Sequence, residues 1–138
     1  MVTGVQTCAL PISIERGEIL TALQYLHHEA NQIIFVASLG RGRPRDVGDL
    51  HLNELLEPRE RERLERVFML PDLSSASLVN AHYSLAHTMW HAGRRSAANW
   101  SAEYPEAFEQ EMVKHVAREL KRIGLWQEGF EMLTLEKP

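Results

Sequence analysis

The sequence predicts an all-α fold in which four to five helices form an up-and-down bundle. Apolar residues recur at spacings of three and four between Ser13 and Leu39, and again in later segments. No segment of convincing length alternates between apolar and polar residues, as a half-buried strand would. Residues that end helices separate these segments, since Gly40, Pro71 and Gly124 each follow one.

The first predicted helix, residues 14–39, is the longest, and we expect the later helices to pack on it. It contains no proline and ends before Gly40, which lacks the β-carbon that is unfavourable at a helix end. At about 1.5 Å per residue it would be roughly 40 Å long, the height of a small bundle. The face expected to be buried consists of Leu20, Leu23, Leu26, Ala30, Ile33, Ile34 and Ala37. The side chains expected on the opposite side are Glu18, Tyr25, Glu29 and Gln32.

Further helices are predicted at about residues 50–56, 58–69, 75–98 and 105–123, followed by a short tail element at 125–133. Pro58 suits the first position of its helix, and Ser74 or Ser75 can cap the next one. The helix at 58–69 alternates Arg and Glu, a pattern typical of a solvated helix face. Residues 14–138 are therefore expected to form a single helical domain.

The composition is that of an ordinary globular domain, with 44% apolar and 25% charged residues in a chain of 138. A net charge of −4 does not favour a nucleic-acid partner. The longest apolar run, residues 33–39, is much shorter than the roughly 20 residues that cross a membrane, so no membrane partner is expected. Cys8 is the single cysteine, which excludes an internal disulfide, and we expect a cytoplasmic protein.

Residues 1–13 are expected to be a leader outside the fold, either non-native or disordered. They lack the basic start and the continuous apolar stretch of a signal peptide. Residues 2–12, VTGVQTCALPI, resemble the translation of a widely used sequencing adapter. On this interpretation the natural upstream part of the protein is missing, and Cys8 has no functional meaning.

Histidines on two predicted helices allow an alternative function, a small metal-binding helical bundle. At about 100° per residue, His82 and His91 lie about 180° apart on their helix, so they cannot converge on one metal with His87. The Glu-x-x-His pairing typical of di-iron bundles does not occur in the chain. We therefore predict no metal ligands, although the available donors are His27, His28, His82, His87, His91, Glu18 and Glu29.

Arg16-Gly17-Glu18 is followed by the pattern ALxxLH, which comprises Ala22, Leu23, Leu26 and His27. This segment resembles the first helix of the C-terminal domain in antibiotic-type nucleotidyltransferases, the lincosamide and aminoglycoside adenylyltransferase group. In that group an arginine-glycine-glutamate step opens a long helix, and further helices pack on it as an up-and-down bundle. The resemblance spans roughly residues 14–123.

The resemblance implies a parent nucleotidyltransferase that modifies a small molecule such as an antibiotic. In this family an N-terminal catalytic domain carries a Gly-Ser signature and paired aspartates, which bind magnesium against a nucleoside triphosphate. The helical domain forms a wall of the substrate cleft and often part of a dimer interface. Because no Gly-Ser followed by Asp-x-Asp occurs here, we expect a truncated, inactive fragment without catalytic residues or cofactors. Its expected partners are the catalytic domain and, in a homodimer, a second copy.

Four residues are candidates for contact with a substrate or with the catalytic domain: Arg16, Glu18, His27 and Trp90. Glu18 would meet a cationic drug or the other domain, or it is an ordinary first-turn glutamate that the helix dipole favours. His27 lies at the edge of the apolar face, where it is expected to be a partly buried packing histidine, the alternative being a base. Trp90 could line a cleft, although aromatic residues in bundles usually belong to the core. A stand-alone helical protein-interaction module is the other function that the sequence leaves open.

Overall fold

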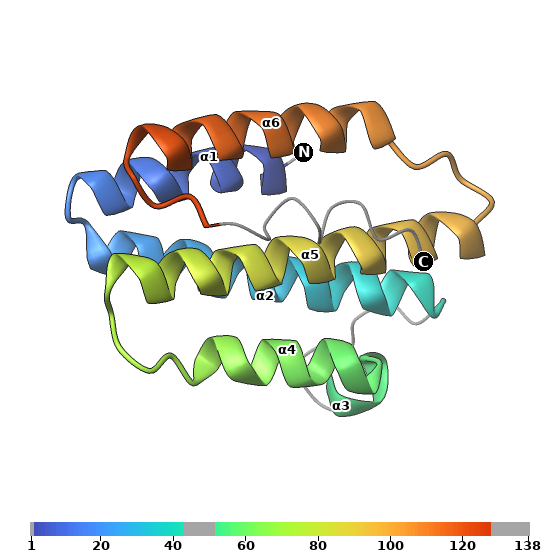
Figure 1. Cartoon of the computed structure of the whole chain (residues 1–138). Helices are drawn as coiled ribbons and strands as arrows, with labels where there is room; N and C mark the ends of the chain where they lie inside the picture. Colours follow the sequence, from blue (N-terminus) through green and yellow to red (C-terminus); the bar gives the residue numbers. More distant parts are fainter. Residues whose placement is uncertain (1, 43–51, 128–138) are drawn as a thin grey trace.

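The computed structural model describes residues 2–42 and 52–127, which contain six α-helices and no strand (Figure 1). This confirms the predicted all-α bundle. No helix in these residues combines the length and the apolar composition that crossing a membrane would require. The helices are α1 (Val2–Glu15), α2 (Ile19–Gly40), α3 (Leu52–Leu55), α4 (Pro58–Phe68), α5 (Ser75–Asn99) and α6 (Glu106–Arg122).

The helices form three layers, with α2 and α5 side by side in the middle (Figure 1). Helices α1 and α6 cover one side of this pair, and α3 and α4 cover the other. The long helices alternate in direction along the chain, as an up-and-down bundle requires. The central pair is parallel, since Glu29 of α2 contacts His82, and Val36 farther along α2 contacts Ser96 farther along α5.

The expected apolar face of the first long helix is largely buried, with Leu23 half-buried and Leu26, Ala30, Ile33, Ile34 and Ala37 in the core. Three positions differ from the prediction. Tyr25, expected on the opposite side, is half-buried and packs against the core. Leu20 is 76% exposed, whereas Glu29 is only 4% exposed. At about 100° per residue, Glu29 lies about 40° from Ile33, next to the apolar stripe and not opposite it. Helix α5 packs on this side of α2, so the buried arc extends to Glu29 and excludes Leu20.

Helix α2 begins at Ile19 and not at residue 14, because the chain turns at Gly17. Gly17 has a φ of +72°, a conformation that glycine adopts without steric cost. The Glu18 amide donates to the Ser13 carbonyl at 2.9 Å and the Gly17 amide to the Ile14 carbonyl at 3.0 Å, the pattern of a Schellman helix end. Arg16-Gly17-Glu18 is therefore the turn between two helices.

Residues 1–13, expected to be a leader outside the fold, belong almost entirely to α1. Leu10 and Ile14 lie four residues apart on one face and are 0% and 6% exposed in the core. Arg122 of α6 donates to both carboxylate oxygens of Glu15, at 2.8 and 2.7 Å, and so ties α6 to the end of α1. The adapter hypothesis concerns the origin of residues 2–12 and stays a prediction.

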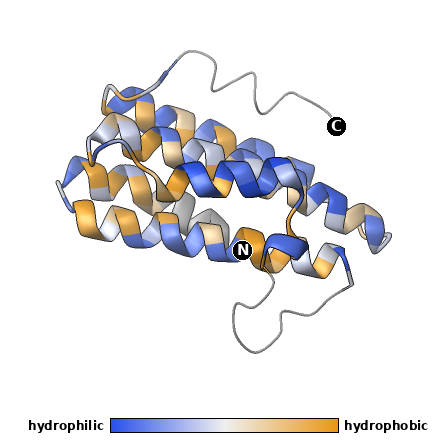
Figure 2. Cartoon of the chain, turned by 90° about the horizontal axis from the view of Figure 1, so that it is seen from below, coloured by the Kyte–Doolittle hydropathy of each residue, from blue (hydrophilic) through white to orange (hydrophobic). Residues whose placement is uncertain are grey.

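The later helices begin and end close to their predicted limits. Pro58 is the first residue of α4, and the Ser74 hydroxyl caps α5 by accepting from the Ser77 amide at 3.2 Å. Seen from below, α4 presents a mostly hydrophilic surface, as its Arg-Glu pattern predicts (Figure 2). Residues 50 and 51 of the predicted helix at 50–56 lie outside the described residues. Of the predicted tail element at 125–133, residues 125–127 are not helical, and residues 128–133 lie outside the described residues.

Side chains from the end of α5 cap the C-terminal end of α2, where the last carbonyls have no partner within their own helix. Asn99 donates its Nδ2 proton to the Gly40 carbonyl at 2.7 Å, and the Trp100 indole donates to the Leu39 carbonyl at 2.7 Å. Asn99 and Trp100 thus have a structural role in aligning the ends of the central helices.

Helices α2 and α5 approach each other closely at Gly40 and Ser96, so we expect that Gly40 cannot be replaced by a larger residue without loss of stability. A β-carbon on Gly40 would lie 2.3 Å from the Ser96 hydroxyl and 3.2 Å from its Cα. Gly40→Ala is therefore expected to lower the free energy of unfolding by about 1–3 kcal/mol, as overpacking does. Urea denaturation of this variant, of Ser96→Ala and of the double variant measures the effect. The double variant should lose less stability than the two single losses combined; strict additivity would contradict the contact.

Candidate functional site

A cavity of about 410 Å³ lies between α2, α5 and α6. Its volume falls within the range of roughly 300–1,000 Å³ that is typical of small-molecule sites. Most of the side chains around it are apolar or aromatic. The lining residues are Glu29, Ile33 and Val36 of α2; Leu85, Ala86, Met89, Trp90 and Gly93 of α5; and Tyr104, Pro105, Phe108, Glu109 and Met112 in or just before α6.

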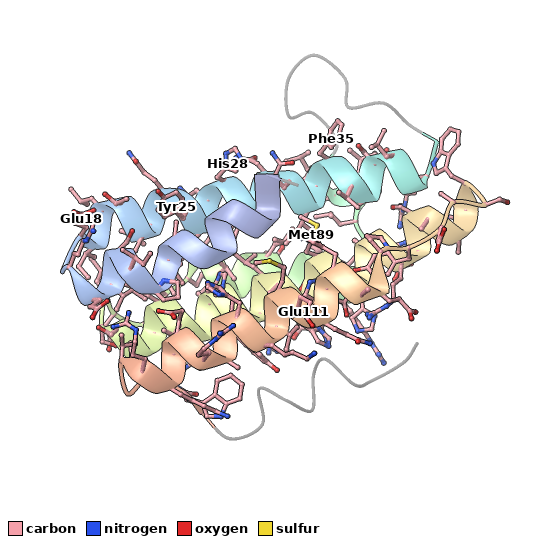
Figure 3. All side chains as sticks on the ribbon, turned by 90° about the horizontal axis from the view of Figure 1, so that it is seen from above. Glu18, Tyr25, His28, Phe35, Met89 and Glu111 are labelled. Atoms are coloured by element: carbon pink, nitrogen blue, oxygen red, sulfur yellow. The ribbon has the colours of Figure 1, made fainter. Side chains whose placement is uncertain are left out.

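The cavity lies between α6 and the central pair of helices. Helix α1 runs beside α2 along only part of its length (Figure 1), and residues 9–15 of α1 are not among the lining residues. The lining residues of each helix recur at spacings of one helical turn, so each helix contributes one face. Met89 lies between α2 and α6, in the middle of the bundle (Figure 3).

A buried acid–imidazole pair joins the central helices beside the cavity. Glu29 Oε2 and His82 Nδ1 are 2.9 Å apart, and the two residues are 4% and 2% exposed. Glu29 lines the large cavity, and His82 lines a smaller cavity of about 30 Å³ that shares Ala86, Trp90 and Met112 with it. Glu29 Oε1 and His82 Nε2 are buried and form no hydrogen bond with any described residue. Buried carboxylates ordinarily use their acceptors, so Oε1 is a polar group without its usual partner.

The second carboxylate of the cavity, Glu109, has partners on both oxygens. Arg94 donates to Oε1, and the Tyr104 hydroxyl donates to Oε2. The Arg94 guanidinium also lies 5.0 Å from the centre of the Tyr104 ring. Burial raises the pKa of the Tyr104 hydroxyl, and the adjacent Glu109 carboxylate raises it further, so this hydroxyl stays a donor. These three residues form a closed network.

Only one of the four residues proposed from the sequence lies at the cavity. Trp90 lines both the large and the small cavity. Arg16 and Glu18 are exposed at the α1–α2 turn, and Figure 3 shows Glu18 at the end of the bundle, away from Met89. His27 is exposed, and its ring centre lies 5.4 Å from that of Phe68.

The structure separates the histidines and glutamates that were considered as metal donors. Glu29 pairs with His82, and His87 pairs with His91, whereas His27, His28 and Glu18 are exposed. In residues 2–42 and 52–127, no group of three or more His, Cys, Asp or Glu side chains could hold a metal ion.

His87 lies between α4 and α5 and is 3% exposed. Arg63 of α4 donates to its Nδ1, and His91 Nε2 lies 3.2 Å from its Nε2. Burial, reinforced by the positive charge of Arg63, lowers the pKa of His87 to about 4. The neutral ring can therefore accept the hydrogen bond from Arg63 at physiological pH.

No protein-family model, curated protein or solved structure matches this chain. Its function is therefore inferred from the cavity and the polar groups around it.

The depressed pKa of His87 predicts acid destabilisation. Between the unfolded value of 6.5 and the folded value of about 4, the unfolded chain binds more protons at this position, so lowering the pH favours unfolding. As the pH falls through this window, protonation of His87 in the unfolded chain should lower the free energy of unfolding by up to about 3 kcal/mol. Urea denaturation from pH 7 to pH 4 measures the slope. His87→Gln should flatten it, whereas His28→Gln, at an exposed position, should not; equal slopes for both variants would refute this role of His87.

Proposed function

We propose that this chain is a helical ligand-binding domain whose cavity between α2, α5 and α6 holds a small, largely apolar molecule. The observation that carries the proposal is the cavity itself, about 410 Å³ in volume, with mostly apolar walls and two buried carboxylates, Glu29 and Glu109. Small-molecule sites commonly combine such walls with a few polar groups that orient the ligand.

We further propose that the domain belongs to a nucleotidyltransferase-like enzyme that modifies a small molecule such as an antibiotic. The resemblance at Arg16-Gly17-Glu18 supports this assignment. The cavity would then hold the acceptor molecule, and an upstream catalytic domain would supply the magnesium and nucleotide sites. The chain contains no Gly-Ser signature followed by Asp-x-Asp. We therefore expect the chain alone to transfer no nucleotide.

A second candidate function is protein interaction, which an exposed apolar patch at the end of α2 favours. Phe35, Leu39 and Trp100 are 44%, 39% and 63% exposed. The Trp100 indole donates to the Leu39 carbonyl, so its ring stays beside Leu39, and Phe35 lies one helical turn before Leu39 on the outer side of α2 (Figure 3). Exposed apolar patches commonly mark interfaces, here with a catalytic domain or with a second copy in a homodimer.

A cavity-filling substitution tests ligand binding. The purified chain is expected to bind the apolar dye N-phenyl-1-naphthylamine, which fluoresces in apolar surroundings. Ala86 lines both cavities, so Ala86→Phe should weaken dye binding at least about tenfold by occupying that volume. Ala98→Phe adds the same group at an exposed position of α5 and should leave the affinity unchanged. A dye affinity that is equal in both variants would place the dye elsewhere and contradict the proposal.

The nucleotidyltransferase assignment has its own test. Sequencing the parent gene upstream of the codon for Ser13 should reveal an α/β domain with a Gly-Ser signature followed by Asp-x-Asp. This prediction depends only on the resemblance and not on the cavity. A natural start codon immediately before Ser13, or an upstream domain without these motifs, would eliminate the assignment while leaving ligand binding open.

A further inference from the structure

We infer that the ligand of this cavity is an apolar molecule with a hydrogen-bond donor, an ammonium or hydroxyl group, at one end, and that this donor binds Glu29 Oε1. The inference rests on the proposed function, because it specifies the chemistry of the molecule that the same cavity holds. Three observations support it: Glu29 Oε1 has no hydrogen-bond partner among the described residues, the cavity is lined by acidic and not basic residues, and the remaining lining side chains are mostly apolar.

Glu29 Oε1 is a hydrogen-bond acceptor without a donor among the described residues. Its carboxylate is fixed by the 2.9 Å contact between Oε2 and His82 Nδ1, so Oε1 is not free to turn away. Oε1 accepts no hydrogen bond from the described residues and has almost no accessible surface of its own. Glu29 lines a cavity large enough for a molecule, so a donor in the cavity would reach Oε1 after a small shift of a neighbouring side chain. Leaving a buried charged acceptor unpaired is unfavourable, and a donor entering from the cavity would remove this cost.

The charges around the cavity favour such a donor over an anion. The acidic residues among the described lining residues are Glu29 and Glu109, and none of these lining residues is Lys or Arg. Glu109 already accepts from Arg94 and Tyr104, so it does not compete for the donor. A carboxylate or phosphate would meet the negative charge of Glu29, whereas an ammonium would form a charge-assisted hydrogen bond with it.

The rest of the cavity favours an apolar body. Met89 and Trp90 of α5 face Phe108 and Met112 of α6 around the same volume. These side chains offer large apolar and aromatic surfaces. A molecule with its donor at Glu29 would therefore extend its apolar part between α5 and α6.

A matched series of naphthalenes tests the inference, with displacement of N-phenyl-1-naphthylamine from the full chain as the readout. The compounds share one ring system and differ in the end group: 1-naphthylmethylamine, 1-naphthylmethanol, 1-ethylnaphthalene and 1-naphthylacetate. The amine and the alcohol are expected to bind at least about tenfold more tightly than 1-ethylnaphthalene, which has no donor. The acetate should bind most weakly because its charge repels that of Glu29.

Substitutions at the acid–imidazole pair identify the atom responsible. Glu29→Gln removes the charge and should reduce the advantage of the amine over the alcohol. Glu29→Leu combined with His82→Leu replaces both buried partners by apolar groups, which such pairs often tolerate, and should abolish the preference for donors. This double variant provides the test if Glu29→Gln does not fold. Glu106→Gln removes a carboxylate from an exposed position near Tyr104 and should preserve the ranking of the native chain.

The outcomes separate this inference from the proposed function. If the native chain binds the dye but 1-ethylnaphthalene binds as tightly as the amine and the alcohol, the inferred donor is wrong and the apolar site stands. If the native chain binds no dye, the proposed function fails as well. Dye binding that appears only after Phe130→Ser and Leu133→Ser would assign the cavity to residues 128–138. Dye affinity that falls as the chain concentration rises would assign the cavity to a second copy, and either result overturns the inference.

Discussion

The parallel contact between α2 and α5 is the constraint on which the rest of this structure depends. It buries the pair formed by Glu29 and His82 and brings the end of α5 against the end of α2. Side-by-side helices that run in the same direction must be connected by a chain that returns along the bundle, and α4 provides the return on one face. Helices α1 and α6 then share the opposite face of the central pair, where the cavity lies.

The cavity occupies part of this face. Near its beginning, α2 is covered by α1, and Leu10 and Ile14 complete the core there. Farther along, the side chains of Met89, Phe108 and Met112 are among those that line an unfilled volume between α2, α5 and α6. A bundle whose sole task was stability would be expected to close such a space, because unfilled volume costs stability. Together with the unpaired Glu29 oxygen, this incomplete packing is what suggests a ligand.

The helix pattern of the sequence predicted much of the fold but little of the site. Leu26, Ile33 and Ile34 are buried as their spacing indicates, because periodicity reports which residues share a face. It does not report how wide the buried face is, and this is why Glu29 and Leu20 were placed on the wrong sides. The turn at Gly17 was missed for a related reason. Gly17, which has a positive φ, ends α1, whereas the sequence pattern was interpreted as one helix that runs through it. Because residues 1–13 were expected to lie outside the fold, no helix was predicted before Gly17.

The candidate site depends on pairing between helices far apart in the sequence, which periodicity within one helix cannot reveal. Trp90 was recognised as a possible cleft residue, but its neighbours in the cavity come from three helices whose order in space the sequence did not specify. Glu29 and His82 each carry an ordinary polar side chain when their helices are considered separately. Only the parallel arrangement of α2 and α5 joins them into a buried pair beside a cavity.

The most direct test of this account is the coupling free energy between Glu29 and His82, measured by urea denaturation of Glu29→Leu, His82→Leu and the double variant. Each single variant leaves one buried partner unsatisfied and should lose about 3–5 kcal/mol, whereas the double variant should recover most of that loss. A coupling free energy of several kcal/mol is therefore predicted. Losses that simply add would show that the two side chains do not meet, and the parallel contact and the cavity beside it would both be wrong.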